Sequence, residues 1–137
     1  MAVFNKFQSF VEAVAEKQHN LQSDTLRVML TNTAPVATNA VKADITEVAA
    51  GNGYATGGPQ VTQSSSAQTA GTYKLVVADT VITASGGPIA SARYAVLYNA
   101  TSGALIGWWD YGATFTLASG ETLTVDFDDA AGVLTLA

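Results

Sequence analysis

Residues 91–137 read SARYAVLYNATSGALIGWWDYGATFTLASGETLTVDFDDAAGVLTLA, and this stretch decides the fold of the chain. Short runs of alternating side chains follow one another through the turn sequences NATSG (residues 99–103) and ASG (residues 118–120). Every second side chain from Ala92 to Tyr98 falls on one face of a strand. No residue with catalytic character separates these strands. The stretch therefore predicts a β-sandwich scaffold, and function is expected from its surface and its assembly.

The strand pattern extends over most of the chain. Further runs that predict strands lie at residues 25–31, 72–78, 81–83, 92–98, 104–111, 113–117, 122–127 and 133–136. Residues 60–69 (QVTQSSSAQT) are polar on both faces, as in an edge strand. About eight strands at a spacing of roughly ten residues are typical of a sandwich or barrel rather than of βαβ units. At 137 residues, the chain is predicted to be a single domain over residues 1–137.

One helix is predicted, over about residues 4–18. Its apolar residues, among them Phe4, Phe7 and Val11, recur every three or four positions and form one stripe. Packing of this stripe against the sheet of the same domain is one interpretation. The alternative is that Phe4 and Phe7 grip a neighbouring subunit.

Residues 33–58 have no regular pattern. They contain Pro35 and the turn sequence GNG at residues 51–53, and only residues 45–48 suggest a short strand or a helical turn. Irregular segments of this length usually make contacts or carry function. We therefore predict a contact arm over residues 33–58, with Pro35, Ile45 and Tyr54 as contact residues. An ordinary surface excursion is the alternative.

Composition and charge favour protein partners. The net charge is −5, only 12% of residues are charged, and the six Lys and Arg residues are scattered along the chain. Phosphate recognition needs clustered basic residues, so nucleic acid is not an expected partner. A surface of small neutral residues can lie against another protein without the cost of burying charges. No apolar run approaches a membrane span, so no membrane is expected either.

The sequence offers few residues for catalysis or for holding a metal. It has no cysteine and a single histidine, His19, which is expected to be a solvated loop residue, so a zinc site is discarded. The acidic run at Asp126, Asp128 and Asp129 lacks the regular calcium-loop pattern. Asp110 with Asp126 would be the pair for glycoside hydrolysis, but nothing fixes their separation. We expect no enzyme activity, no cofactor and no metal.

Two adjacent tryptophans, Trp108 and Trp109, form the most prominent aromatic group. Adjacent strand residues point to opposite faces, so one of them is expected in the core and the other near the surface. A sugar-binding site needs several aromatic side chains on one face, whereas a single exposed tryptophan suits a protein interface. We therefore predict Trp108 and Trp109 as further contact residues.

The order of these segments resembles the capsid cement, or decoration, proteins of tailed bacteriophages. The segments that carry the resemblance are residues 4–7 (FNKF), 24–35 (DTLRVMLTNTAP), 44–47 (DITE), 51–54 (GNGY), 93–99 (RYAVLYN) and 105–112 (LIGWWDYG). The resemblance implies a jelly-roll-like antiparallel sandwich. It also implies a structural virion protein on the capsid exterior, held in the host cytoplasm before assembly.

The partner implied by this resemblance is the major capsid protein, whose neighbouring subunits the protein would bridge. Contacts between copies on the lattice, or a homo-oligomer, are expected as well. Two alternatives stay open at this stage. One is a tail tube or head-to-tail joining protein, and the other is a carbohydrate-binding β-sandwich module.

Overall fold

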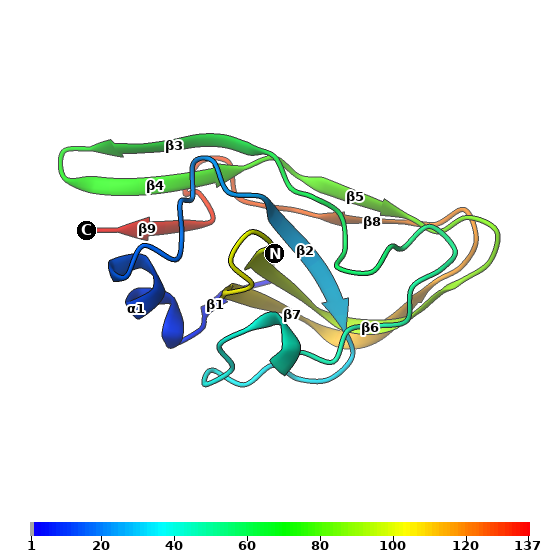
Figure 1. The fold of residues 1–137 in the computed structure, drawn as a ribbon. Coiled ribbons are helices and arrows are strands. Elements are labelled where there is room, and N and C mark those ends of the chain that lie inside the picture. The colour runs from blue at the N-terminus through cyan, green and yellow to red at the C-terminus, as the bar shows by residue number, and fades with distance from the viewer. Residues whose placement is uncertain (1) are drawn as a thin grey trace.

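The computed structural model describes residues 2–137, which form a mainly β protein with antiparallel sheets and one α-helix (Figure 1). The elements in chain order are β1 (Phe4–Lys6), α1 (Ser9–Ala15), β2 (Leu26–Thr31), the 3-10 helix η1 (Lys42–Asp44), β3 (Gln63–Thr69), β4 (Thr72–Val77), β5 (Thr80–Thr83), β6 (Ile89–Asn99), β7 (Leu105–Leu117), β8 (Thr122–Val125) and β9 (Leu134–Leu136). No helix in residues 2–137 has the length and apolar character of a membrane span.

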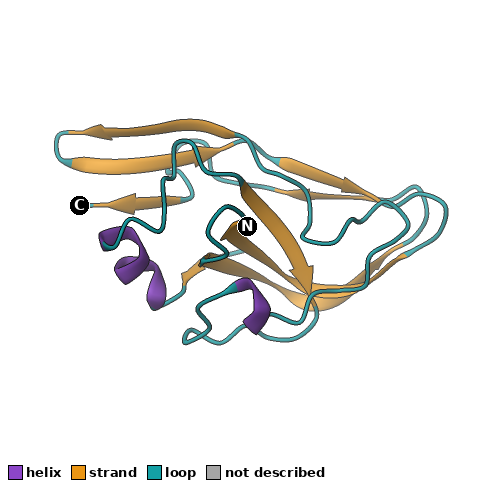
Figure 2. Ribbon diagram, in the orientation of Figure 1, coloured by secondary structure: helices purple, strands orange, loops and turns teal. Residues whose placement is uncertain are grey.

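The strands lie in two layers, which confirms the predicted β-sandwich (Figure 2). One layer is a four-stranded sheet in the order β1-β7-β6-β2. The other combines the sheet β3-β4-β9 with the pair β5-β8, and only Ala78 and Asp79 separate β4 from β5. Nine strands are present in the described residues, where about eight were predicted. The jelly-roll strand order stays a prediction.

The long strands β6 and β7 dominate the four-stranded sheet, as the opening stretch predicted. All residues from Tyr94 to Asn99 are buried, because both faces of this sheet are covered. A strand buried on both faces has a nearly continuous apolar sequence, which accounts for the run YAVLY. β7 continues through Gly112, so the two strands predicted at 104–111 and 113–117 are one.

Two apolar clusters stabilise the sandwich. The larger lies between the layers and takes side chains from both, for example Leu97 of β6 and Leu75 of β4. The smaller covers the outer face of the four-stranded sheet and consists of Phe7, Met29, Ile45, Val96, Tyr98 and Leu105, with Trp108 packed against it. The outer face is therefore a second core.

The predicted helix over residues 4–18 is wrong in its extent. α1 covers only Ser9–Ala15, and Phe4–Lys6 forms β1, which pairs with β7. Gly107 explains this pairing, because the Phe4 ring occupies the space that a Cβ at Gly107 would need. The ring centroid of Phe4 also lies 5.2 Å from that of Trp109. Tertiary pairing thus overrides the helical spacing of the first residues.

Candidate contact surface

The predicted arm, residues 33–58, is irregular apart from η1, but it is not a free arm. Its second half runs along the outer edge of β2. The N–H of Val48 donates to the carbonyl of Leu30 at 3.0 Å, and directly after the arm the carbonyl of Pro59 accepts the N–H of Val28 at 3.1 Å. The segment therefore supplies hydrogen-bond partners to an edge that would otherwise be open.

Tyr54 clamps this segment to β2. Its buried hydroxyl accepts a hydrogen bond from the N–H of Leu30 at 2.9 Å and donates to Glu47 Oε1 at 2.7 Å. The same carboxylate oxygen accepts the N–H of Gly57 at 2.5 Å. Burial raises the pKa of the Tyr54 phenol far above its usual range, so the hydroxyl keeps its proton. The clamp is thus part of the folded core.

The first half of the segment is held over the turn between β6 and β7. The N–H of Lys42 donates to Gly103 at 2.9 Å, and the N–H of Leu105 donates to Ala40 at 3.0 Å. Asp44 Oδ2 accepts the N–H groups of Ala40 and Val41, at 2.8 and 3.1 Å. These two bonds lower the pKa of the Asp44 carboxyl. Residues 40–44 therefore have a fixed conformation.

Four of the seven predicted contact residues are buried within this chain, and contact of any of the seven with a partner stays a prediction. Phe7, Ile45, Tyr54 and Trp109 are buried in the chain's own core. Their apolar side chains pack in the two core clusters of the domain. Phe4, Pro35 and Trp108 are half-buried.

The arm exposes two apolar residues that the sequence analysis did not single out. Val36 is 57% exposed and Val41 is 46% exposed, although both flank a segment with many backbone hydrogen bonds. Val3, Val11 and Val81 are also exposed, at 75%, 51% and 57%, but Val36 and Val41 are the two exposed valines that share one hydrogen-bonded segment. The signal in the sequence was the pair of β-branched residues within an otherwise small and polar stretch. We name Val36, Val41 and the backbone between them the contact surface.

No known protein family, curated protein or solved structure matches this chain.

Trp108 and Trp109 lie on opposite faces of the sheet, as the alternation of strand residues predicted. Trp109 faces the core between the layers, with its ring centroid 5.4 Å from that of Phe127. Trp108 lies on the other face, with its ring centroid 4.5 Å from that of Phe7. Because the two rings lie on opposite faces of the sheet, they do not form a flat platform for stacking a sugar.

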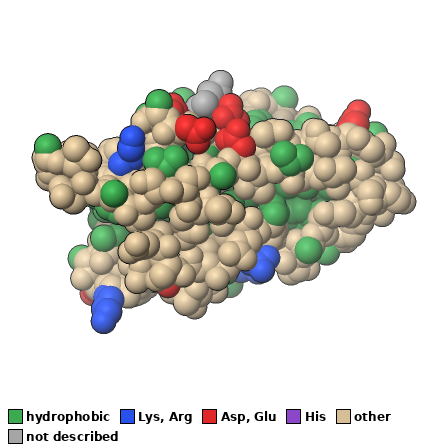
Figure 3. Space-filling view, turned by 90° about the horizontal axis from the view of Figure 1, so that it is seen from above, with side chains coloured by type: hydrophobic (Ala, Val, Ile, Leu, Met, Phe, Trp, Pro, Cys, Tyr) green, Lys and Arg blue, Asp and Glu red, His purple; other side chains and the backbone are tan. Residues whose placement is uncertain are grey.

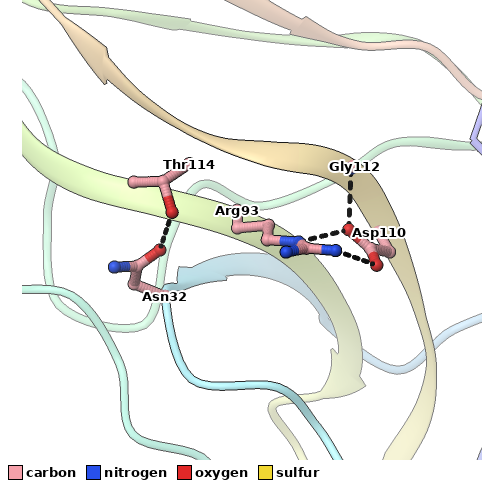
Figure 4. A network of polar contacts seen from close by, with 5 residues as sticks. All are labelled: Asn32, Arg93, Asp110, Gly112 and Thr114. Carbon is pink, nitrogen blue, oxygen red and sulfur yellow. Dashed lines mark hydrogen bonds and ion pairs between the residues drawn. The ribbon is translucent and has the colours of Figure 1, made fainter.

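The two carboxylates considered for hydrolysis do line one surface hollow. Asp110 and Asp126 both border a cavity of about 440 Å³ together with Tyr111. Asp110 is nevertheless engaged: Arg93 donates to both of its oxygens at 2.8 and 3.0 Å, and the N–H of Gly112 donates at 2.7 Å (Figure 4). The Arg93 hydrogen bonds lower the pKa of Asp110, so this carboxyl does not hold a proton to donate near neutral pH.

Tyr111, which borders the same cavity, keeps its hydroxyl proton near neutral pH. Burial, together with the nearby charge of Asp126, raises the pKa of Tyr111 to about 12. The Arg93–Asp110 pair joins the neighbouring strands β6 and β7. Beside it, Thr114 of β7 donates to Asn32 at 2.9 Å and ties the start of the arm to the sheet (Figure 4).

The prediction that His19 is a solvated loop residue is wrong. His19 is only 9% exposed, and its ring centroid lies 5.2 Å from that of Phe10. Asn99 Oδ1 accepts the N–H groups of Thr101 and Ser102, so Asn99 presents its amide nitrogen to His19 Nδ1 at 3.1 Å. Nδ1 therefore accepts, and the proton of the neutral ring is on Nε2, which has no partner.

Burial lowers the pKa of His19, although the charge of Asp24 opposes this effect. Protonation would place an N–H on Nδ1 against the Asn99 amide, so the site favours the neutral ring. In residues 2–137, no three His, Cys, Asp or Glu side chains gather so that they could hold a metal ion. His19 is best understood as a packing residue of the core.

Proposed function

We propose that this chain is a structural virion protein that binds the outer surface of a tailed-phage capsid and cements neighbouring subunits of the major capsid protein. The observation that carries the proposal is the contact surface. Val36 and Val41 are exposed on a segment that is hydrogen-bonded into the sandwich on both sides. A surface that is already rigid loses little conformational entropy on binding, which suits a protein that stiffens a shell.

The binding free energy that the contact surface can contribute is small, which suits a protein that binds in many copies. Complete burial of a valine side chain contributes about 1.5–3 kcal/mol. Since Val36 and Val41 are roughly half exposed, the two together offer about 2 kcal/mol. One such contact is weak, but contacts repeated on a symmetric lattice act together.

The charge distribution supports a neutral protein partner. Figure 3 shows the face formed by the β3–β4 and β5–β8 layer, on the other side of the sandwich from the contact surface; on it Lys and Arg are isolated, acidic side chains gather at one edge, and most of the surface carries no charge. The full chain has six basic and 11 acidic residues in 137. A neutral surface of this kind meets another protein without the desolvation of many charges.

The experiment is sedimentation of purified protein with expanded capsids that lack it. The test variant combines Val36→Asp with Val41→Asp, which places two charges on the contact surface. Val81→Asp is the matched control, because Val81 is 57% exposed, like Val36, but lies on β5 in the other layer. Exposed substitutions of this kind change folding stability by about 0.5 kcal/mol or less.

We expect the double variant to bind at least about tenfold more weakly, with Val81→Asp close to the wild type. Failure of the wild type to bind capsids would overturn the proposal. Rings of purified protein in electron micrographs would instead support a tail tube or joining protein. A specific signal on a glycan array would support a carbohydrate-binding module.

A further inference from the structure

β3 forms a long open sheet edge. It lies at the end of the order β3-β4-β9 and has seven residues. Residues 89–93 of β6 and 110–117 of β7 extend beyond their partners β2 and β1 and are open as well, but register shifts interrupt the pairing of these two halves. The edge of β2 is covered by the arm, whereas β1 and β9 have three residues each and β5 and β8 have four each. Short or covered edges are the usual protection against pairing with another chain. β3 has neither protection.

The sequence of β3 also lacks the residues that block edges. Its letters are QSSSAQT, with no charge and no proline. The register shifts between Gln63 and Ser65, and the strand then pairs regularly with β4 as far as Thr69. A regular polar strand of this length presents its outward backbone groups as a template for another strand.

The hairpin turn decides which backbone groups point outward. Ala70 and Gly71 form its tip with φ of 51° and 84°, as in a type I′ turn. Such a turn makes Thr69 and Thr72 a hydrogen-bonded pair, and pairs then alternate along the strand.

Ser66 and Gln68 are therefore in the pairs without hydrogen bonds to β4, opposite Leu75 and Tyr73. Their N–H and C=O groups point away from the sheet. Ala67 lies between them, and its backbone groups face β4.

We propose that β3 pairs in antiparallel fashion with β3 of a second copy, about a two-fold axis at Ala67. In this register, Ser66 and Gln68 of the partner subunit exchange hydrogen bonds with Gln68 and Ser66, so all outward groups of both residues are satisfied. The two Ala67 residues face each other with Cα atoms about 4.5 Å apart. Alanine is the smallest residue of β3, so the close approach at the axis meets no steric barrier.

A second copy is the occupant that this edge fits best. The strand is neutral, so two copies meet without charge repulsion, and each supplies the groups that the other lacks. Two short polar strands bury far less than the roughly 1,200 Å² of a stable complex, so the free dimer is weak. On a lattice, the same pairing links adjacent copies. The inference rests on β3 alone and does not depend on capsid binding.

Disulfide trapping tests this register, because the chain has no cysteine. The single variant Ala67→Cys brings two thiols together at the axis, with a Cα separation inside the range of about 4.4–6.8 Å that a disulfide needs. Thr83→Cys on β5 is the control, since Thr83 is also exposed but lies on a different strand. We expect mild oxidation to link Ala67→Cys at least about tenfold faster than Thr83→Cys.

A second substitution in the Ala67→Cys background tests the hydrogen bonds. Gln68→Pro removes an outward N–H from each strand, and Gln68→Lys places a charge on the edge. Both also remove the hydrogen bond from the N–H of Gly71 to Gln68 Oε1 in the hairpin turn, so Gln68→Ala, which loses only that bond, is the control and should link at the rate of Ala67→Cys alone. Circular dichroism confirms that each variant is folded, and Gln68→Pro and Gln68→Lys should both slow linkage by about tenfold. Equal rates for Ala67→Cys and Thr83→Cys, or no loss in folded Gln68→Pro or Gln68→Lys, would overturn the inference.

Discussion

Replacing Tyr54 with phenylalanine removes one hydroxyl and keeps the buried ring. The N–H of Leu30 then loses its acceptor, and Glu47 loses a donor but keeps the N–H of Gly57. A buried N–H without a partner costs about 1–3 kcal/mol, and a hydrogen bond to a charged group adds about 1.5 kcal/mol. We expect Tyr54→Phe to lower the free energy of unfolding by about 2.5–4.5 kcal/mol, measured by urea denaturation.

Tyr111→Phe is the matched control, because the Tyr111 hydroxyl makes no side-chain hydrogen bond to any residue in 2–137. The same chemical change at Tyr111 should alter the free energy of unfolding by about 0.5 kcal/mol or less. The difference in free energy of unfolding between Tyr54→Phe and Tyr111→Phe therefore measures what the two Tyr54 hydrogen bonds contribute to stability. A Tyr54→Phe variant as stable as Tyr111→Phe would refute the view that the arm is built into the core.

Further predictions concern the crossing of the arm over β2 and the buried histidine. A Cβ at Gly58, where φ is +72°, would lie 1.9 Å from the carbonyl oxygen of Val28, so Gly58→Ala should cost about 3 kcal/mol or more. Gly86→Ala has a similar φ of +78° but nothing within 4 Å, so urea denaturation should show a loss of only about 1 kcal/mol. The lowered pKa of His19 means that the unfolded chain binds a proton more readily, so stability should fall as the pH falls below 6.5. His19→Asn keeps an acceptor for Asn99, and unfolding between pH 7 and pH 5 should then lose this slope; an unchanged slope would contradict the burial of His19.

Much of the architecture could be predicted from local patterns. Alternation located β6 and β7, placed Trp108 and Trp109 on opposite faces, and identified residues 60–69 as an edge strand. These properties depend on the two-residue period of a strand, which the sequence displays directly. The absence of regular pattern in residues 33–58 likewise predicted an irregular segment.

The parts that could not be predicted depend on contacts between distant residues. Phe4 lies in a strand because Gly107 leaves room for its ring, and His19 is buried because Asn99 and Phe10 surround it. Tyr54 looked like a surface residue because its partner Leu30 is 24 positions away. Exposure of Val36 likewise follows from the path of the arm and not from its neighbours in the chain.

The orientation of the protein on a capsid is the property that most directly tests the proposed function. A cryo-electron microscopy map of capsids bearing the protein measures this, because the sandwich and its β3–β4 hairpin can be oriented in density. We expect Val36 and Val41 at the interface with the major capsid protein, and the arm in the conformation described above. Absence of the protein from the shell, or attachment through the opposite layer with both valines facing solvent, would contradict the account.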